Sequence, residues 1–369
     1  TNAGWQVTVP SHRFDIALEA DLLEELARVY GYENVPVEPP LAPMDFSLVR
    51  EAKLPTRVFR DSLVARGYRE AVTYSFIDPE LHMLFFNGLG AVELTNPIAS
   101  DMAVMRTSLL PGLVKTASYN LHRQQRRLQL FEHGLRFALK KDGEIDQRTT
   151  LAGLLYGERN AEGWLSKPEA VKAPGQHPDR FDFYDMKADV QALLDPIVAN
   201  SNEAIEFHAL NDGDGYPCLH PGQSAAVCRG NRRVGVLGAL HPKLLAALDI
   251  DIDIWLFELD MPLISDKKVP KFKELSKFPE VRRDLAIIVD QAIPVGDVLA
   301  AAKRAAADEL QALVVFDRYR GEGVGEGKQS IGLGLTWQHP ARTLQDDEVA
   351  TLTNNVVAAL QEQFNAQLR

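Results

Sequence analysis

The sequence predicts an α+β protein of two or three domains. Its 369 residues exceed the roughly 100 to 200 residues of a single domain. Helical and β-type hydrophobic patterns alternate irregularly through residues 54–265, which is typical of an antiparallel sheet flanked by helices. Hydrophobic residues make up 46% and charged residues 25% of the chain, as in ordinary globular proteins. We therefore expect a short helix-containing region, an antiparallel sheet core and a C-terminal α/β sandwich.

The N-terminal region predicts one strand, one helix and a linker. Residues 5–9 alternate between apolar and polar side chains, and apolar residues recur with helical spacing from Ala20 to Tyr30. The prolines of residues 33–43 exclude a helix interior or a central strand and indicate a linker. Because Thr1 is not an initiator Met and the chain opens inside a predicted strand, we expect a fragment of a longer polypeptide.

The middle region predicts two helices and a set of apolar strands. The helices cover residues 55–66 and 110–122, and a turn around Asn231 marks a hairpin between two of the strands. Residues 157–180 carry little apolar periodicity and indicate a long surface excursion. The predicted strands cover residues 128–137, 151–156, 225–229, 234–240 and 254–259.

The C-terminal region predicts a separate α/β sandwich. The lysine-rich residues 266–277 indicate a connector before it. The elements that follow come in the order strand, helix, strand, strand, helix, which is the order of a ferredoxin-like sandwich. They cover residues 284–289, 294–309, 312–316, 330–337 and 346–364.

The charge balance limits the possible partners of the chain. Its 40 Lys and Arg against 51 Asp and Glu give a net charge of −11. No overall basic field can therefore hold it to nucleic acid or to an anionic membrane, and any RNA contact must use a local patch. The sequence has neither a signal-like N-terminus nor an apolar run of about 18 residues, so we expect a cytoplasmic protein without a membrane partner.

The common catalytic motifs are absent from the sequence. It contains no P-loop, no dinucleotide-binding fingerprint, no H-E-x-x-H and no G-x-S-x-G. The glycine-rich run at residues 321–328 lies between two predicted strands and includes two glutamates, which favours a hairpin loop over a phosphate-binding loop. Cys218, Cys228 and the scattered histidines lack the spacing of a metal site, so we predict no catalytic residue.

An acidic cluster at the first predicted helix has two explanations. Carboxylates gathered on one helix face can bind a hard cation such as Mg2+. Acidic residues also favour the first turn of any helix through its dipole, and the spacing alone favours this second explanation. The four residues of the cluster are Asp15, Asp21, Glu24 and Glu25.

Two groups of basic residues are candidates for contact with RNA. Residues 115–148 could meet phosphate or form the solvated end of a helix, and the pattern leaves both open. Residues 275–369 hold ten Lys or Arg and thirteen Asp or Glu, so this region is not basic overall. Its cations near predicted strand ends and loops are Arg282, Arg283, Arg318, Arg320 and Lys328.

Several longer motifs carry a resemblance to a known family. The chain opens with WQVTVPSHRFDIALEADLLEELARVYGYENVP. The middle region contains MRTSLLPGLVKTASYN at 105–120, LFEHGLRF at 130–137, HPGQSA at 220–225 and GVLGALHP at 235–242. The C-terminal region contains KFPEVRRDLAII at 277–288, FDRYRGEGVGEGKQSIGLGL at 316–335 and RTLQDDEV at 342–349. These motifs resemble, in the same order, the beta subunit of bacterial phenylalanyl-tRNA synthetase.

The resemblance implies a ligase subunit that does not catalyse. In this family two alpha and two beta subunits attach phenylalanine to its tRNA, and ATP and phenylalanine react on the alpha subunit. The beta core is class II synthetase-like, and here its stretch GVLGALHPKLL contains His241-Pro242 and no ATP-holding arginine. The implied domains are the end of a small domain at 1–37, this core with its linkers at 38–274 and a ferredoxin-fold anticodon-binding domain at 275–369.

The resemblance also assigns sites. The magnesium site of the family falls on the acidic cluster, which reverses the preference drawn from spacing, and the C-terminal cations become the candidate tRNA-binding residues. The family's editing domain lies upstream, so we expect no editing by this chain. The alternatives are an independent RNA-binding accessory protein, which should bind tRNA without an alpha subunit, and a hydrolase on a synthetase-like scaffold. The hydrolase would need a catalytic constellation that the sequence lacks.

Overall fold

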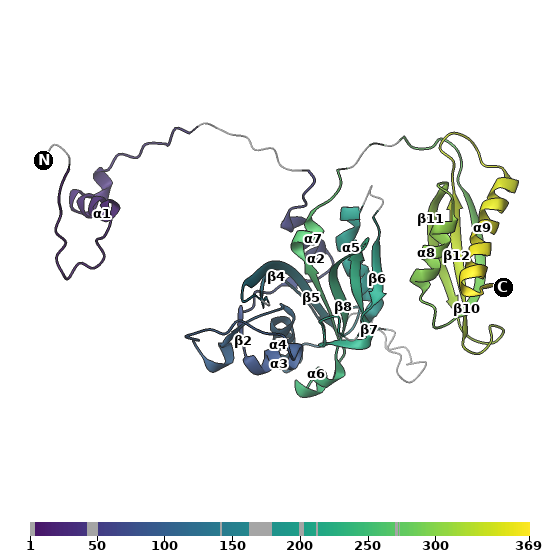
Figure 1. Cartoon of the computed structure of the whole chain (residues 1–369), viewed down its shortest axis with the longest axis horizontal. Helices are drawn as coiled ribbons and strands as arrows, with labels where there is room; N and C mark the ends of the chain where they lie inside the picture. Colours follow the sequence, from purple (N-terminus) through teal and green to yellow (C-terminus); the bar gives the residue numbers. More distant parts are fainter. Residues whose placement is uncertain are drawn as a thin grey trace. The chain divides into compact units, whose positions relative to one another are not determined.

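Figure 1 shows the computed structural model of the chain, which describes residues 4–42, 51–140, 142–161, 179–198, 203–211, 213–269, 272 and 274–369. The chain divides into two compact units, residues 1–50 and residues 51–369. Helices and mostly antiparallel sheets occur together, which confirms the predicted α+β class. The domain boundaries predicted after residues 37 and 274 stay predictions.

The first unit contains the predicted N-terminal helix. It is α1 (Glu19–Tyr30), followed by the short 3-10 helix η1 (Tyr32–Asn34). The Asp21 carboxylate accepts a hydrogen bond from the backbone N–H of Leu18 at 2.7 Å, which satisfies a donor that the helix leaves free at its start. Gly31, at φ +95°, ends the helix in a conformation that other residues rarely adopt.

The strand predicted over residues 5–9 is wrong. Residues 4–10 form neither strand nor helix, and Trp5 is 98% exposed. A strand is stabilised by hydrogen bonds to a neighbour, and the described part of this unit contains no second strand. The linker predicted over residues 33–43 has no regular structure from residue 35 to residue 42, and residue 43 lies outside the described residues.

The second unit contains a seven-stranded sheet with the strand order β1-β4-β5-β9-β8-β7-β6. Every neighbouring pair is antiparallel except β1 and β4, so the prediction of an antiparallel core is confirmed. The strands are β1 (Arg69–Glu70), β4 (Leu128–Leu139), β5 (Ile145–Tyr156), β6 (Ile205–Ala209), β7 (Leu219–Arg229), β8 (Arg232–Leu240) and β9 (Ile254–Asp260).

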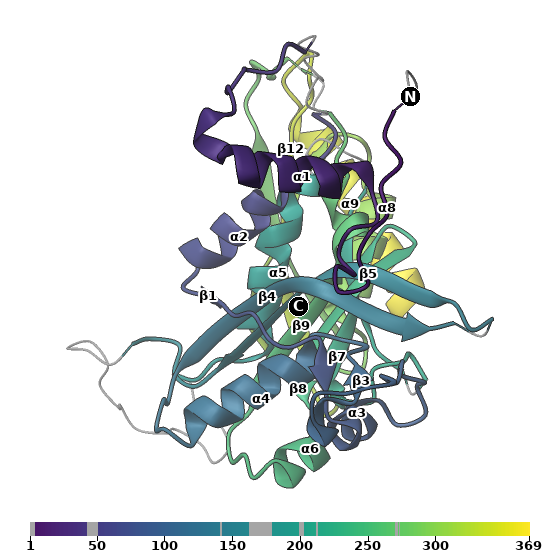
Figure 2. The ribbon, with the colours of Figure 1, turned by 90° about the vertical axis from the view of Figure 1, so that its left-hand side faces the viewer.

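Helices cover both faces of this sheet, as Figure 2 shows for α2 and α5 on one side and for α3, α4 and α6 on the other. Each face has its own apolar core because successive strand residues point in opposite directions: Leu155 joins the first core and Leu154 the second. The first face is covered by α2 (Thr56–Ala65), α5 (Phe183–Val198) and α7 (Met261–Ser265), the second by α3 (Pro79–Phe86), α4 (Leu110–Leu121) and α6 (Pro242–Ala247).

Most elements predicted for this core are present. The helices α2 and α4 match their predicted ranges within two residues, and the turn at Asn231 joins β7 to β8 as a hairpin. The helices α3 and α5 and the strand β6 were not predicted. Of the predicted excursion at 157–180, residues 162–178 lie outside the described residues. The segment before α4 adds the pair β2 (Phe76–Ile77) and β3 (Val104–Met105) and the 3-10 helix η2 (Ser100–Met102).

The C-terminal region forms a four-stranded sheet in the order β11-β12-β10-β13, with α8 and α9 packed on one face. The predicted strand, helix, strand, strand, helix order is confirmed, and β13 adds an edge strand. Within the described residues, no helix combines the length and apolar character needed to cross a bilayer. The elements are β10 (Val281–Asp290), α8 (Val295–Ala305), β11 (Leu310–Tyr319), β12 (Lys328–Trp337), α9 (Asp346–Phe364) and β13 (Gln367–Leu368).

Candidate functional site

Arg13 lies at the centre of the predicted magnesium cluster. Its Nη2 atom is 2.9 Å from Asp15 Oδ2 and 2.7 Å from Glu25 Oε1. The Nη2 atom of Arg28 reaches the other Glu25 oxygen at 2.7 Å. The hydrogen bonds from Arg13 and then Arg28 lower the pKa of Glu25 to about 2. Two of the four predicted carboxylates are therefore already paired with arginine.

The other two carboxylates of the cluster are used differently. Asp21 accepts hydrogen bonds from the backbone N–H groups of Ala17 and Leu18, both at 2.7 Å, and these bonds lower its pKa. The Glu24 side chain is exposed. Among the described residues, no three His, Cys, Asp or Glu side chains are gathered in a way that could hold a metal ion. In this arrangement the four acidic residues do not form one cation site.

A buried ion pair joins the segment before α4 to strand β4. Arg106 Nη1 is 2.6 Å from Glu132 Oε1, and the two side chains are only 4% and 2% exposed. Thr73 donates its hydroxyl to the other Glu132 oxygen at 2.7 Å, and Arg106 Nε donates to the Leu135 carbonyl at 2.8 Å. These additional hydrogen bonds offset part of the cost of burying a charged pair.

A second buried carboxylate, Glu258 of β9, holds the residues directly before α4. Its Oε1 atom accepts hydrogen bonds from Ser108 Oγ and from the Leu109 N–H, both at 2.8 Å. Its Oε2 atom accepts from the Tyr216 hydroxyl at 3.1 Å. Burial raises the pKa of Glu258. Together the two carboxylates fasten α4 across this face of the sheet, so the helix and its side chains occupy it.

The stretch predicted to lack an ATP-holding arginine lies where β8 ends and α6 begins. His241 Nδ1 accepts a hydrogen bond from the Lys243 N–H at 3.0 Å and thereby caps α6. Burial lowers the pKa of His241, which favours the neutral ring that can accept this bond. A neutral imidazole used as a helix cap offers no fixed positive charge to a nucleotide phosphate.

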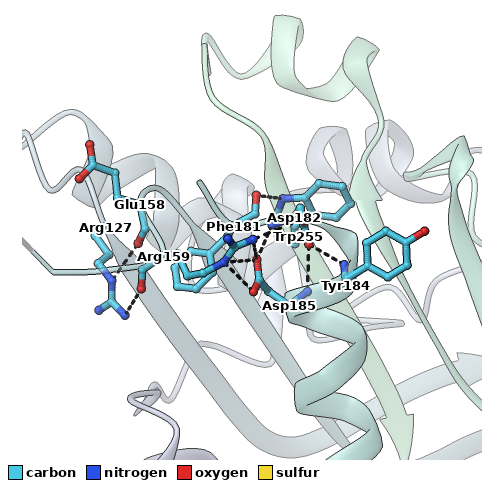
Figure 3. Close-up of polar contacts among 8 residues, drawn as sticks. All are labelled: Arg127, Glu158, Arg159, Phe181, Asp182, Tyr184, Asp185 and Trp255. Atoms are coloured by element: carbon cyan, nitrogen blue, oxygen red, sulfur yellow. Dashed lines mark hydrogen bonds and ion pairs between the residues drawn. The ribbon is translucent and has the colours of Figure 1, made fainter. Parts of the chain in front are cut away.

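Figure 3 shows a polar cluster around the first turn of α5. Asp182 Oδ1 accepts hydrogen bonds from backbone N–H groups of this turn, as an N-terminal cap does. Arg159 donates three hydrogen bonds to Asp185, at 2.8, 2.9 and 3.1 Å, and Trp255 Nε1 donates to the Phe181 carbonyl at 3.0 Å. These contacts link α5 to β9 and to the segment after β5, which is a structural role.

The face of the C-terminal sheet opposite its helices is open to solvent. Val314 and Phe316 of β11 are 50% and 52% exposed, whereas the alternating neighbours of Val314 pack in the core. The guanidinium carbon of Arg282 lies 5.8 Å from the centre of the Phe316 ring. Its side chain lies over Gly334, which leaves room for it, and Arg282 Nε is 2.9 Å from Asp284 Oδ1. An exposed aromatic ring and a cation are therefore adjacent on this face.

The other predicted tRNA-binding cations are distributed differently. Strand alternation places Arg283 on the helix side of the sheet, where Nη2 is 2.9 Å from Asp346 Oδ1 at the start of α9. Arg318 and Arg320 come together, because both donate to Gln329 Oε1, at 2.9 and 3.3 Å. Lys328 is exposed at the end of the glycine-rich loop, which connects β11 to β12 as the sequence predicts. The five cations do not form one patch.

The described basic residues of 115–148 are spread over α4, the segment between α4 and β4, β4 itself, the turn after it and β5. Arg123 donates to the Tyr119 carbonyl at 3.1 Å and stacks on the Tyr119 ring. A cation bound to the last carbonyls of a helix is stabilised by the helix dipole. These contacts favour the interpretation of this basic region as the end of a helix over its interpretation as a phosphate-binding site.

Residues 35–261 match the sequence family described as "Phenylalanyl tRNA synthetase beta chain CLM domain", which is more than half of the chain. The chain belongs to this family. Residues 276–369 match "Ferredoxin-fold anticodon binding domain", and residues 1–32 match "tRNA synthetase B5 domain". The resemblance to phenylalanyl-tRNA synthetase beta subunits that the sequence motifs indicate is confirmed.

Relatives named phenylalanine–tRNA ligase beta subunit are similar along almost the whole chain. That of Pseudomonas fluorescens is 47% identical over 365 residues, that of Pseudomonas putida 48% over 368 and that of Hahella chejuensis 44% over 366. Each alignment covers 99% of this chain and 44% of the relative, so the chain spans less than half of their length. A solved pyrrolysyl-tRNA synthetase from Desulfitobacterium hafniense aligns with 57% of this chain and 66% of its own, at 14% identity and a TM-score of 0.38.

Sequence reasoning missed several residues of these sites. Phe316 and Val314 belong to a strand that the sequence predicts only as apolar. Their alternation with core residues could have shown that they lie on the face of the sheet opposite the core. Glu132 directly follows the apolar residues Leu130 and Phe131, and Glu258 stands between two apolar residues of β9; a charge in such a position signals a buried polar partner. Arg13 carried no periodic signal that would connect it with Glu25, twelve residues away.

Proposed function

We propose that this chain is the C-terminal part of a phenylalanine–tRNA ligase beta subunit. It supports an alpha subunit in the ATP-dependent attachment of phenylalanine to its tRNA, through subunit assembly and tRNA binding. Membership of the beta chain family favours this function over an independent RNA-binding accessory protein. The complete ligase would be a heterotetramer of two alpha and two beta subunits in the cytoplasm, where charged tRNA is consumed.

The chain alone is proposed to be inactive in amino-acid activation. The support is that His241 serves as a helix cap at the β8–α6 junction and that α4 occupies the neighbouring face of the sheet. Phenylalanine-dependent exchange between ATP and pyrophosphate tests this proposal on the purified chain without an alpha subunit. We expect no exchange above background, and measurable exchange that follows the chain through purification would contradict the proposal.

The tRNA-binding part of the proposal rests on one observation, the open sheet face with Phe316 and Arg282 side by side. Proteins recognise single-stranded RNA loops by stacking bases on aromatic rings and guanidinium groups, with cations that hold the phosphates. Lys328, exposed at the end of the nearby loop, is available for a phosphate. Three other arginines stay candidates for tRNA binding: Arg283, Arg318 and Arg320. To contact tRNA, each would have to break or share the hydrogen bond that it makes within the domain.

The experiment uses a complete ligase that carries the substitutions Phe316→Ala or Arg282→Ala. Loss of one stacked base costs about 1 to 3 kcal/mol, so we expect the tRNA KM to rise roughly fivefold to a hundredfold with phenylalanine activation unchanged. The matched control is Arg304→Ala, which removes an exposed cation of α8 from the same domain and should change the tRNA KM less than twofold. Equal tRNA KM values in all variants would refute the interface, as would unchanged tRNA affinity after deletion of residues 275–369.

Mg2+ is the proposed cofactor, with Asp15, Asp21, Glu24 and Glu25 as its ligands. An octahedral Mg2+ ion takes oxygen ligands and keeps several waters. Because Arg13 binds two of these carboxylates, the guanidinium group would have to move away before the ion could be held. The proposed site therefore competes with an ion pair inside the same unit.

A further inference from the structure

A small cavity at one end of the core sheet has no part in the proposed function. Its volume is about 140 Å³, below the roughly 300 to 1,000 Å³ typical of sites for drug-sized ligands. It can hold a small ion or molecule. Strands β4, β5, β8 and β9 contribute to its lining, which includes Arg136, Arg148, Thr150, Arg233, Glu258 and Asp260.

Two guanidinium groups of this cavity form no ion pair with a carboxylate among the described residues. Pairing of β4 with β5 places Arg136 directly opposite Arg148, and like charges in such positions are unfavourable. Arg148 is neutralised by Asp146 at 2.8 Å and by Asp260 at 3.2 Å. Arg136 makes no hydrogen bond or ion pair with any other described residue, and Arg233 donates to a backbone carbonyl at 3.0 Å. The cavity therefore has two cations that an anion could neutralise.

Two buried oxygen atoms of the lining also lack hydrogen-bond partners. Thr150 is 1% exposed, and neither its Oγ1 atom nor the buried Asp260 Oδ1 atom has a hydrogen-bond partner among the described residues. The two residues stand opposite each other on β5 and β9, so both atoms belong to the same part of the lining. A buried polar atom without a partner costs free energy, which a bound group with both donors and acceptors would recover.

Glu258 does not compete for such a group, because its two oxygens already accept three hydrogen bonds. Burial raises the pKa of its carboxyl, and the positive charge of Arg136 acts in the opposite direction. A ligand that complements this cavity must therefore carry negative charge near Arg136 and Arg233. It must also form a hydrogen bond with the Thr150 hydroxyl and donate one to Asp260.

We propose that this cavity binds a phosphate group that carries a proton. The guanidinium groups of Arg136 and Arg233 and the Thr150 hydroxyl donate to phosphoryl oxygens, and the P–OH group donates to Asp260 Oδ1. Bonds from guanidinium to phosphate are among the strong hydrogen bonds of proteins. Sulfate has the same shape but no proton at neutral pH, so its oxygens would face the Asp260 carboxylate without a hydrogen between them.

The test is calorimetric titration of the chain with inorganic phosphate, and with sulfate as the matched anion. We expect saturable phosphate binding at least tenfold tighter than sulfate binding. Arg136→Gln should weaken phosphate binding about tenfold and Thr150→Val about fivefold, from the loss of a charged and a neutral hydrogen bond. Asp260→Asn removes the negative charge and adds an N–H donor, which should bring sulfate to within about threefold of phosphate, since an amide can donate to either anion.

Arg57→Gln is the control for charge alone, because Arg57 is an exposed arginine of α2 paired with Asp61. It should leave phosphate affinity unchanged. Thr150→Val removes an unpartnered hydroxyl, so its melting temperature without ligand should not fall, and this shows that the fold is retained. At the same phosphate concentration, phosphate should raise the melting temperature of the wild type more than that of Arg136→Gln.

A second titration identifies the source of the phosphate. If 5′-AMP displaces inorganic phosphate, the bound phosphate group belongs to a nucleotide whose nucleoside stays outside the cavity. If 5′-AMP does not displace inorganic phosphate, the ligand is free phosphate. Both results support the site. The proposal is overturned if phosphate gives no saturable binding, if sulfate binds as tightly to the wild type, or if Arg57→Gln weakens binding as much as Arg136→Gln.

Discussion

Replacement of Glu132 by Leu should destabilise the core sheet strongly. The substitution removes three hydrogen bonds: from Arg106 Nη1 at 2.6 Å, from the Thr73 N–H at 3.2 Å and from the Thr73 hydroxyl at 2.7 Å. Arg106, itself only 3% exposed, would keep its charge without a counter-ion. Removal of one partner from a buried ion pair costs about 3 to 5 kcal/mol.

The double substitution Arg106→Met with Glu132→Leu separates this charge effect from a packing defect. Because no charge then stays buried, we expect it to cost about 2 kcal/mol less than Glu132→Leu alone. The exposed pair of Arg57 and Asp61 is the control, and Asp61→Ala should cost about 0 to 1 kcal/mol.

Amide hydrogen exchange of β4 and β5 is the suitable assay, because it reports the opening free energy of this sheet without contribution from the C-terminal domain. The reasoning is refuted if Glu132→Leu lowers the opening free energy by less than about 1 kcal/mol. A double variant that is less stable than the single variant would also show that packing, and not the buried charge, decides stability here.

Two further predictions concern the other carboxylates. Glu258 has a pKa raised above its ordinary value of 4.5, so its contribution to stability is fully present below that pH and is lost as the pH rises through the folded pKa. Glu258→Gln should therefore become less destabilising relative to the wild type as the pH rises from about 4.5; denaturant unfolding between pH 4 and 8 checks this, and a constant difference would contradict it. Arg13→Ala should tighten Mg2+ binding to residues 4–42 in the chain, seen as amide shifts of α1 in a Mg2+ titration; an unchanged titration, compared with Arg57→Ala, would remove the proposed competition.

The sequence by itself determined much of the local structure and the family. Helices α2, α4 and α9 and the C-terminal element order follow from hydrophobic periodicity, which depends only on neighbours a few residues apart. The hairpin at Asn231 follows from turn chemistry in the same local way. Long motifs such as MRTSLLPGLVKTASYN indicated the beta chain family, because their residues stand together in the chain.

The tertiary structure alone decided which residues meet. Strand alternation separates Arg282 from Arg283, but only the packing of α8 and α9 on one face leaves Arg282 and Phe316 in solvent. The strand predicted over residues 5–9 needed a partner strand that this unit does not supply among its described residues. The cavity brings Arg136 together with Asp260, more than a hundred residues further along the chain, through the pairing of β4, β5 and β9. Such contacts depend on long-range strand order, about which the local spacing of residues carries no information.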